Sequence, residues 1–290
     1  MQELDLRSLE IFRAVAVEGS VTKAAEKLHR VQSNISTRIK QLEERLQKPL
    51  FLRQNRRLIL TADGELLLSY ADRLLQLSMA ASEALNEDTP RGVFRIGTME
   101  STAISRLPEI LSEYHQLYPD VRIELETDVA GGLLDRLRNH DIEIAFAAEP
   151  VSFSDLVTMP VFAETLVLVA PESLPAIDDP ATLSGKTVVA FEPGCAYRRY
   201  LEEWLLEAGI VPGGIISVSS YPAILACVSA GAGFAVVPQS VLDRVSTGAG
   251  LRFHALPEKV SGIRTLLASR ADYRSVKLDA LRKLLPAFEG

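Results

Sequence analysis

The chain has 290 residues, of which 47% are hydrophobic and 24% charged, and its formal net charge is −7. This length accommodates two or three compact units of ordinary globular composition. The sequence has two cysteines, an acidic N-terminus without an apolar signal segment, and no apolar run near the ~18 residues that span a bilayer. These features argue against a disulfide scaffold, an exported protein and a membrane protein. We therefore expect a cytoplasmic protein with no membrane partner.

The charges divide the chain into a basic head and an acidic body. Residues 1–60 contain twelve Lys or Arg and seven Asp or Glu, which gives this part a charge of +5 and leaves −12 for the remainder. A small basic module joined to a larger acidic body is typical of a nucleic-acid-binding domain attached to a second domain.

Within the head, Val21–Lys40 predicts two short amphipathic helices joined by a tight polar turn, because its apolar residues recur at helical spacing. Small residues at Ala24 and Ala25 allow the two helices to cross closely. The outward face of the second helix combines short hydrogen-bonding side chains with cations, which suits an α-helix in a DNA major groove. This face carries Gln32, Ser33, Asn34, Ser36, Thr37, Arg38 and Lys40. The alternative is an ordinary surface helical hairpin.

Two further segments complete the head. Leu6–Val17 predicts a third helix that closes a small core, and Lys48–Leu60 predicts two short strands around a basic turn. Such a strand pair is typical of a β-wing placed beside a recognition helix. Its candidate DNA contacts are Asn55, Arg56 and Arg57.

A long helix follows the wing, from an N-cap at Thr61 through Glu87, with no proline and a single glycine. Its apolar residues form a surface too wide for a solvated spacer. We expect this surface to pair with a second copy of the chain; the alternative is packing against its own subunit. Residues 86–92 are polar and contain proline and glycine, which predicts a linker.

Beyond residue 92, strand and helix patterns alternate. This alternation predicts a parallel sheet flanked by helices, arranged as two α/β lobes around a cleft with two chain crossings between them. The expected strands are Val93–Gly97, Val121–Thr127, Ile142–Ala147, Thr165–Ala170, Thr187–Phe191, Ile215–Val218, Gly233–Pro238 and Arg264–Ala268. The expected helices are Ser101–Tyr118, Gly131–Asn139, Ala196–Ala208, Tyr221–Ala230 and Lys277–Leu285.

Taken together, these segments resemble the LysR-type transcriptional regulators over essentially the whole chain. The head carries the most specific positions of this resemblance, among them Ala24-Ala25, Gln32-Ser33, Pro49-Leu50-Phe51 and Leu60-Thr61. Asn34 departs from the small apolar residue that the family often has, which affects the expected base preference. Gln47-Lys48 stands where a glycine is common, which affects the shape of the turn.

The resemblance implies an α/β multi-domain fold. A winged helix-turn-helix is expected at 1–60, a dimerising linker helix at 61–89, and a two-lobed effector domain like a periplasmic binding protein at 90–290. Lobe I is expected at about 92–161 and 267–290, and lobe II at about 162–266. The implied partners are a double-stranded DNA operator, a second copy in a homodimer or homotetramer, a small-molecule effector and RNA polymerase. The resemblance adds Thr22 and Arg53 to the expected DNA contacts and implies no enzymatic activity.

Two loops of the body, residues 97–102 and 192–198, each follow a strand and open a helix. In a two-lobed fold they face one another, so free backbone N–H groups, hydroxyls and Arg198 predict an anion-binding pocket. Glu100 and Glu149 add negative charge, which suits a carboxylate or a zwitterion such as an amino acid. For Glu100 the alternative is stabilisation of a helix start. The expected effector contacts are Thr98, Met99, Glu100, Ser101, Thr102, Ala148, Glu149, Gly194, Cys195, Tyr197, Arg198, Ser220 and Tyr221, with Ser219 beside them.

Three other functions compete with an effector-controlled regulator. Cys195 stands at a helix start beside two arginines, which predicts a lowered thiol pKa, so a redox sensor is one alternative to a pocket-lining role. An α/β enzyme joined to a DNA-binding head is another, but the chain has no complete dinucleotide, P-loop or nucleophile-elbow motif. A ligand-free scaffold is the third, and the expected cleft argues against it. The four histidines lack metal-ligand spacing, so we expect no metal and no cofactor.

Overall fold

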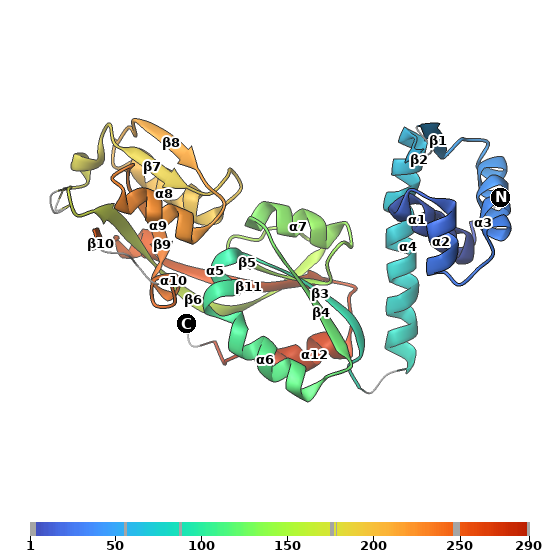
Figure 1. Ribbon diagram of the computed structural model, residues 1–290. Helices are drawn as coiled ribbons and strands as arrows, with labels where there is room; N and C mark the ends of the chain where they lie inside the picture. The colour runs from blue at the N-terminus through green and yellow to red at the C-terminus, as the bar shows by residue number, and fades with distance from the viewer. Residues whose placement is uncertain are drawn as a thin grey trace. The chain divides into compact units, whose positions relative to one another are not determined.

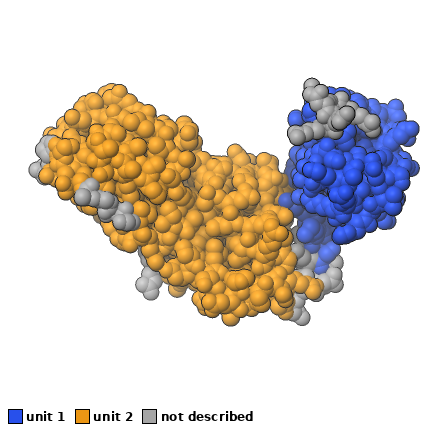
Figure 2. All heavy atoms as spheres, viewed as in Figure 1, with its two compact units in different colours: residues 1–87 blue, residues 88–290 orange. Residues whose placement is uncertain are grey.

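The computed structural model describes residues 4–54, 57–86, 89–174, 177, 179–245 and 250–288. It divides the chain into two compact units, residues 1–87 and residues 88–290, which Figure 2 shows in different colours. Within the described residues, no helix combines the length and apolar character that a membrane span requires.

Three helices form the core of the first unit: α1 (Leu6–Glu18), α2 (Val21–Lys27) and α3 (Gln32–Leu46). The side chains of Asp5 and Ser20 cap α1 and α2 by accepting hydrogen bonds from backbone N–H groups of the first turn. Buried apolar residues fill the space between the helices, among them Phe12, Ala24 and Ile35. The three-helix core with a small-residue crossing, which the sequence predicts, is confirmed.

A two-stranded wing follows α3. β1 (Phe51–Gln54) pairs antiparallel with β2 (Arg57–Leu60). The Glu43 carboxylate of α3 accepts hydrogen bonds from the backbone N–H groups of Leu50 at 2.8 Å and Phe51 at 3.2 Å, so α3 fixes where the hairpin begins. The turn before the wing is made by Gln47, whose φ of 53° lies in the left-handed region where a glycine is easier to accommodate.

The long helix α4 (Ala62–Asn86) has two different apolar faces. Leu67 is only 9% exposed and lies with Ala71 in the core formed with α1–α3. A second stripe is exposed at one-turn spacing and consists of Leu66, Tyr70, Leu74 and Leu77. The apolar surface that the sequence assigns to self-association is therefore divided, and only its exposed stripe is available to a partner.

One seven-stranded sheet organises the second unit, in the order β10-β6-β11-β5-β3-β4, with β9 also paired to β6. Its strands are β3 (Gly92–Thr98), β4 (Val121–Thr127), β5 (Ile144–Ala148), β6 (Leu156–Pro171), β9 (Ala235–Pro238), β10 (Leu251–Ala255) and β11 (Gly262–Arg270). β3 is parallel to β4 and β5, whereas β11 is antiparallel to β5 and β6, and β6 is antiparallel to β9 and β10. The predicted parallel sheet is therefore confirmed for β3, β4 and β5 and is wrong for β6, β9, β10 and β11. The reason is that β6 and β11 carry the chain between the lobes in opposite directions.

Lobe I consists of β3–β5 and the adjoining halves of β6 and β11, with α5 (Glu100–Ser105), α6 (Leu107–Leu117), α7 (Ala130–Arg138) and α12 (Val276–Arg282). Helices α6 and α12 cover one face of the sheet and α7 the other (Figure 1). The single helix predicted over Ser101–Tyr118 is wrong. It is broken at Arg106, because Pro108 provides no N–H and its ring excludes a continuous helix at this point.

Lobe II contains β9, β10 and a parallel pair, β7 (Thr187–Ala190) and β8 (Gly214–Ser217). Its helices are α8 (Ala196–Glu207), α9 (Tyr221–Ser229), α10 (Gln239–Leu242) and α11 (Glu258–Ser261), with a 3-10 helix at Pro180–Leu183. The strand β10 and the three short helical elements α10, α11 and the 3-10 helix were not expected from the sequence. β6 and β11 run through both lobes, and their register shifts between Thr265 and Leu266, where Val161 has no partner residue.

Candidate functional site

The exposed face of α3 is the first candidate site. Ile35, Ile39 and Leu42 are buried, and the residues between them point outward. No side chain caps the start of α3, where Val31 is the N-cap residue, and of the first-turn N–H groups that of Asn34 donates to the Val31 carbonyl at 3.0 Å. The predicted contacts Thr22, Gln32, Ser33, Asn34, Ser36, Thr37 and Lys40 are exposed, and Arg38 is half-buried.

The wing supplies the remaining predicted DNA contacts. Arg53 lies on β1 and Arg57 on β2, opposite Leu58 and Gln54 respectively. Asn55 and Arg56 lie outside the described residues, as do the side chains of Arg53 and Arg57.

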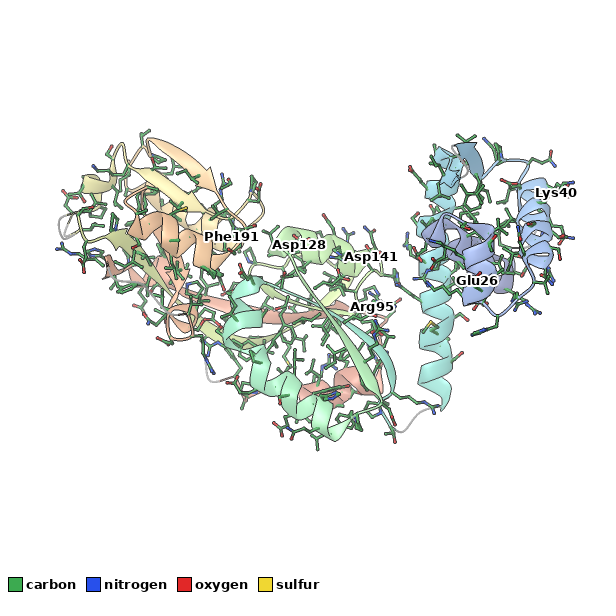
Figure 3. All side chains as sticks on the ribbon, viewed as in Figure 1. Glu26, Lys40, Arg95, Asp128, Asp141 and Phe191 are labelled. Atoms are coloured by element: carbon green, nitrogen blue, oxygen red, sulfur yellow. The ribbon has the colours of Figure 1, made fainter. Side chains whose placement is uncertain are left out.

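A cavity of about 220 Å³ between lobes I and II is the second candidate site. The N-terminal residues of α5, α7, α8 and α9 all border it, as expected for an α/β sheet whose ligands bind beyond the carboxyl ends of the strands. Phe191 of lobe II and Asp128 of lobe I mark its two sides in Figure 3. Its lining residues are Met99, Glu100, Ser101, Thr127, Asp128, Val129, Ala130, Phe191, Glu192, Cys195, Ala196, Tyr197, Ser219 and Tyr221.

Three carboxylates border this cavity, Glu100, Asp128 and Glu192, and no lysine, arginine or histidine does. Asp128 and Glu192 are exposed, whereas the Oε2 atom of Glu100 is shielded from solvent and has no hydrogen-bond partner. Burial raises the pKa of Glu100, and the backbone N–H of Tyr221 partly opposes this effect.

Two buried hydroxyls complete the polar lining. Ser101 and Tyr197 are each 3% exposed, and their hydroxyls make no hydrogen bond of good geometry, although the Ser101 and Thr265 hydroxyls both act on that of Tyr197. Burial raises the pKa of Tyr197, so its hydroxyl keeps its proton at neutral pH. Buried hydroxyls whose hydrogen bonds are poorly aligned are costly, so a bound molecule or water that completes their hydrogen bonds is favoured in this cavity wall.

The predicted effector contacts divide among three places. Met99, Glu100, Ser101, Cys195, Tyr197 and Tyr221, with Ser219, line the cavity. Ala148, Gly194 and Arg198 line a neighbouring hollow of about 410 Å³, which shares Cys195 with the first. Thr98, Thr102, Glu149 and Ser220 border neither of these hollows.

Hydrogen bonds and ion pairs within the protein explain why Ser220, Glu149 and Arg198 do not line the first cavity. The Ser220 side chain caps α9 by accepting a hydrogen bond from the Ala223 N–H at 3.3 Å. The Glu149 carboxylate pairs with Arg264 at 2.6 Å. Arg198 directs its guanidinium away from the cavity, because it donates to Glu202 at 2.7 Å and to the Phe191 carbonyl at 3.0 Å.

Two further lining residues, Glu192 and Ala196, belong to the loop 192–198 that the sequence assigns to the pocket. Apart from Ser219 and Tyr221, the lining residues outside both predicted loops are Thr127, Asp128, Val129, Ala130 and Phe191. Asp128 had a detectable signal, because it follows the predicted strand Val121–Thr127 and precedes a predicted helix, as the two loops that were chosen do.

Cys195 does not have the thiol environment that the sequence predicts. Burial raises the pKa of this thiol, and this effect exceeds the lowering by the nearby Arg198 and by the backbone N–H groups of α8. Both Cys195 and Cys227 are free thiols. Among the described residues, no group of three or more histidines, cysteines and carboxylates is placed to hold a metal ion.

Comparison with known proteins assigns both units. Residues 6–65 match the model of the bacterial regulatory helix-turn-helix protein, lysR family, and residues 87–288 match the LysR substrate binding domain. The HTH-type transcriptional regulator CzcR of Bacillus thuringiensis subsp. konkukian is 36% identical over 287 residues, which are 99% of this chain and 97% of that protein. GltR of Bacillus subtilis is 35% identical over 270 residues, 93% of this chain and 91% of that protein.

Solved structures agree on the fold of the full chain. A full-length OxyR from Pseudomonas aeruginosa superposes with a TM-score of 0.72 at 22% identity, covering 99% of each chain. Full-length CbnR complexed with its target DNA superposes with a TM-score of 0.70 at 21% identity, covering 97% of this chain and 99% of that one.

Proposed function

The chain belongs to the LysR family of DNA-binding transcriptional regulators, and we propose that it reads its operator with α3 and responds to a small molecule held between lobes I and II. The observation that carries this proposal is the interlobe cavity, which residues of both lobes border and whose wall includes the buried side chains of Ser101 and Tyr197. A ligand that contacts both lobes favours one lobe arrangement by its differential affinity for the two, and this is the basis of control.

The exposed face of α3 supports the proposed reading of DNA. Gln32 and Ser33 present short donors and acceptors suited to base edges, while Arg38, Lys40 and the open helix start suit phosphates. Arg53, Asn55, Arg56 and Arg57 of the wing are proposed as further contacts of the double-stranded operator.

Self-association is proposed through the exposed stripe of α4. Its four large apolar side chains lie along one helix face, and a second copy of the same stripe would cover them symmetrically. A homotetramer and a contact with RNA polymerase are proposed from family membership alone.

A carboxylate or an amino acid is the proposed class of effector. The starts of α7 and α8 offer backbone N–H groups to a carboxylate, and Ser101 and Tyr197 place hydroxyls in the cavity wall. The apolar walls, among them Phe191 and Val129, suit a small carbon skeleton. A redox role for Cys195 is less well supported, since burial raises its thiol pKa.

The experiment is a thermal-shift screen of carboxylates and amino acids on the full chain, followed by mobility shift with operator DNA. We expect Ser101→Ala and Tyr197→Phe to bind DNA normally but to lose the response to the screened ligand. Ser112→Ala, an exposed serine of α6, is the matched control. A normal response in both cavity variants, or a ligand bound outside the cavity, contradicts the proposal. Loss of response in Cys195→Ser under reducing agent-free conditions alone would favour the redox alternative.

A further inference from the structure

Glu100 is placed to contact a ligand as well as the start of its own helix. It is the first residue of α5, where a carboxylate interacts favourably with the partial positive charge of the helix start. Its shielded Oε2 atom makes no hydrogen bond of good geometry and borders the cavity. The backbone N–H that acts on the Glu100 carboxylate belongs to Tyr221 of α9, in the opposite lobe. Glu100 therefore extends across the cavity between the lobes.

The charges around the cavity are not balanced by the protein. Asp128 and Glu192 add two carboxylates to that of Glu100, and the residues bordering the cavity include no side-chain cation. Arg198 does not supply one, because Glu202 and the Phe191 carbonyl hold its guanidinium. The helix starts contribute only partial positive charge, roughly half an elementary charge each. A ligand that also carries a cation is therefore favoured over one that carries only negative charge, because the cation would compensate the Glu100 carboxylate.

We propose that Glu100 binds the ammonium group of the effector, so that the cavity selects amines and amino acids over carboxylates that carry no cation. This inference rests on the proposed effector function and names the chemistry of that site. The buried side chains of Ser101 and Tyr197 line the same cavity and bind the polar remainder of the ligand. An ammonium group at Glu100 lies beside Tyr221 of lobe II and so bridges the two lobes.

The experiment compares ligands that differ only in the ammonium group. Calorimetry on the full-length protein uses three sets: an L-amino acid, its 2-hydroxy acid and its decarboxylated amine, for leucine, phenylalanine and glutamate. We expect at least one amine-bearing member to bind and its 2-hydroxy acid to bind at least tenfold more weakly. Glu100→Gln should weaken that amine about tenfold to hundredfold, the range for loss of a charged hydrogen bond. Glu113→Gln, the same change at an exposed position of α6, should not alter the affinity.

The pH dependence gives an independent readout. Protonation of Glu100 competes with the ammonium group, so the affinity of wild-type protein for the amine should fall as the pH is lowered, and that of Glu100→Gln should fall less. The inference is overturned if no amine-bearing member binds, if a 2-hydroxy acid binds as tightly as its amino acid, or if Glu100→Gln retains full affinity. A 2-hydroxy acid that binds and is lost in Ser101→Ala with Tyr197→Phe would leave the proposed effector site intact and remove only the role of Glu100.

Discussion

At Gly64 the absence of a side chain allows α4 and the wing to approach closely. A Cβ atom built there would lie 2.3 Å from the carbonyl oxygen of Leu50 and 3.0 Å from Cδ2 of Leu60. Gly64→Ala should therefore destabilise the first unit by about 1–3 kcal/mol, the usual cost of overpacking. Urea denaturation measures this loss. Gly214→Ala is the control, because nothing lies within 4 Å of a Cβ built at that glycine. Equal losses in the two variants would contradict the steric explanation.

Glu100 is expected to reduce stability at neutral pH. Its pKa in the folded protein is raised by burial, so folding favours the protonated form and the ionised form opposes folding. Glu100→Gln should be the more stable protein above the raised pKa, and this advantage should vanish as the pH falls below 4.5, the ordinary value. Because the side chain is partly solvated, we expect a gain of only about 1–2 °C in Tm. Thermal melts at several pH values test this, with Glu113→Gln as control. A lower Tm of Glu100→Gln at pH 7 would show that the carboxylate stabilises the fold.

Some cavity residues could be predicted from the sequence because their residue type and their place between a strand and a helix were enough to identify them. Ser101 and Cys195 could be predicted because each stands where a strand gives way to a helix. The role of Arg198 was missed although its pairing with Glu202 is an i,i+4 signal within α8; only its contact with the Phe191 carbonyl depends on how α8 packs. The thiol pKa of Cys195 was mispredicted for the same reason: neighbouring charges are visible in the sequence, whereas burial is not.

At the scale of the element, α3 combines a buried apolar face with an exposed polar one. Gln32→Ala or Ser33→Ala should weaken binding to the cognate operator by about 1–3 kcal/mol if either side chain reads bases, and should leave non-specific binding nearly unchanged. A mobility-shift titration with cognate and scrambled duplexes measures both affinities. Ser112→Ala on the second unit controls for the mutation itself. Full affinity and unchanged base preference in both α3 variants would mean that α3 is not the reading helix.

The two faces of α4 should respond differently to charge. Leu66→Asp with Leu74→Asp places two carboxylates in the exposed stripe and should lower the oligomer mass and specific DNA binding without unfolding the chain. Leu67→Asp should instead lower the melting temperature, since Leu67 belongs to the core of its own subunit. Light scattering and circular dichroism separate the two effects. The control Leu206→Asp with Val211→Asp adds equal charge at exposed positions outside α4. An unchanged mass in the stripe variant would exclude this face from the interface.

The periodicity of apolar residues predicted where the helices and strands of this chain lie, but not where a helix is interrupted or how far a strand extends. Pro108 separates α5 from α6. This proline was visible in the sequence, but the prediction of one continuous helix followed the apolar spacing of the segment instead. The length of β6 could not be read in the same way, because Leu156–Pro171 includes alternating and fully apolar parts that belong to different lobes. The sequence predicts two chain crossings between the lobes, but no local pattern encodes the direction of the crossing strands, on which the antiparallel pairing of β11 with β5 and β6 depends.

At the scale of the effector unit, the crossing strands carry polar contacts that join the two lobes. Glu164 of β6 is buried, pairs with Arg106 of lobe I at 2.8 Å and accepts a hydrogen bond from Ser240 of lobe II at 2.6 Å. A buried carboxylate with partners on both sides is costly to separate from either. Movement of the lobes is therefore coupled to the contacts that Glu164 makes with Arg106 and Ser240. Glu164 lies on β6, which pairs with β11 across the register shift at Thr265.

A second interlobe contact offers a milder test of this coupling. The Tyr200 hydroxyl of α8 donates a hydrogen bond to the Glu149 carbonyl of lobe I at 3.2 Å. Tyr200→Phe removes this bond, worth about 0.5–1.5 kcal/mol, and so disfavours the arrangement in which both lobes enclose the cavity.

Because a ligand in the cavity must then also offset this lost bond, we expect the half-maximal effector concentration to rise roughly threefold to tenfold. Fluorescence anisotropy with labelled operator, titrated with effector, measures this concentration. Tyr118→Phe, the same change within lobe I, should leave it unaltered. Identical half-maximal concentrations for wild type and Tyr200→Phe would show that the lobes do not change their relative position at this contact when the effector binds.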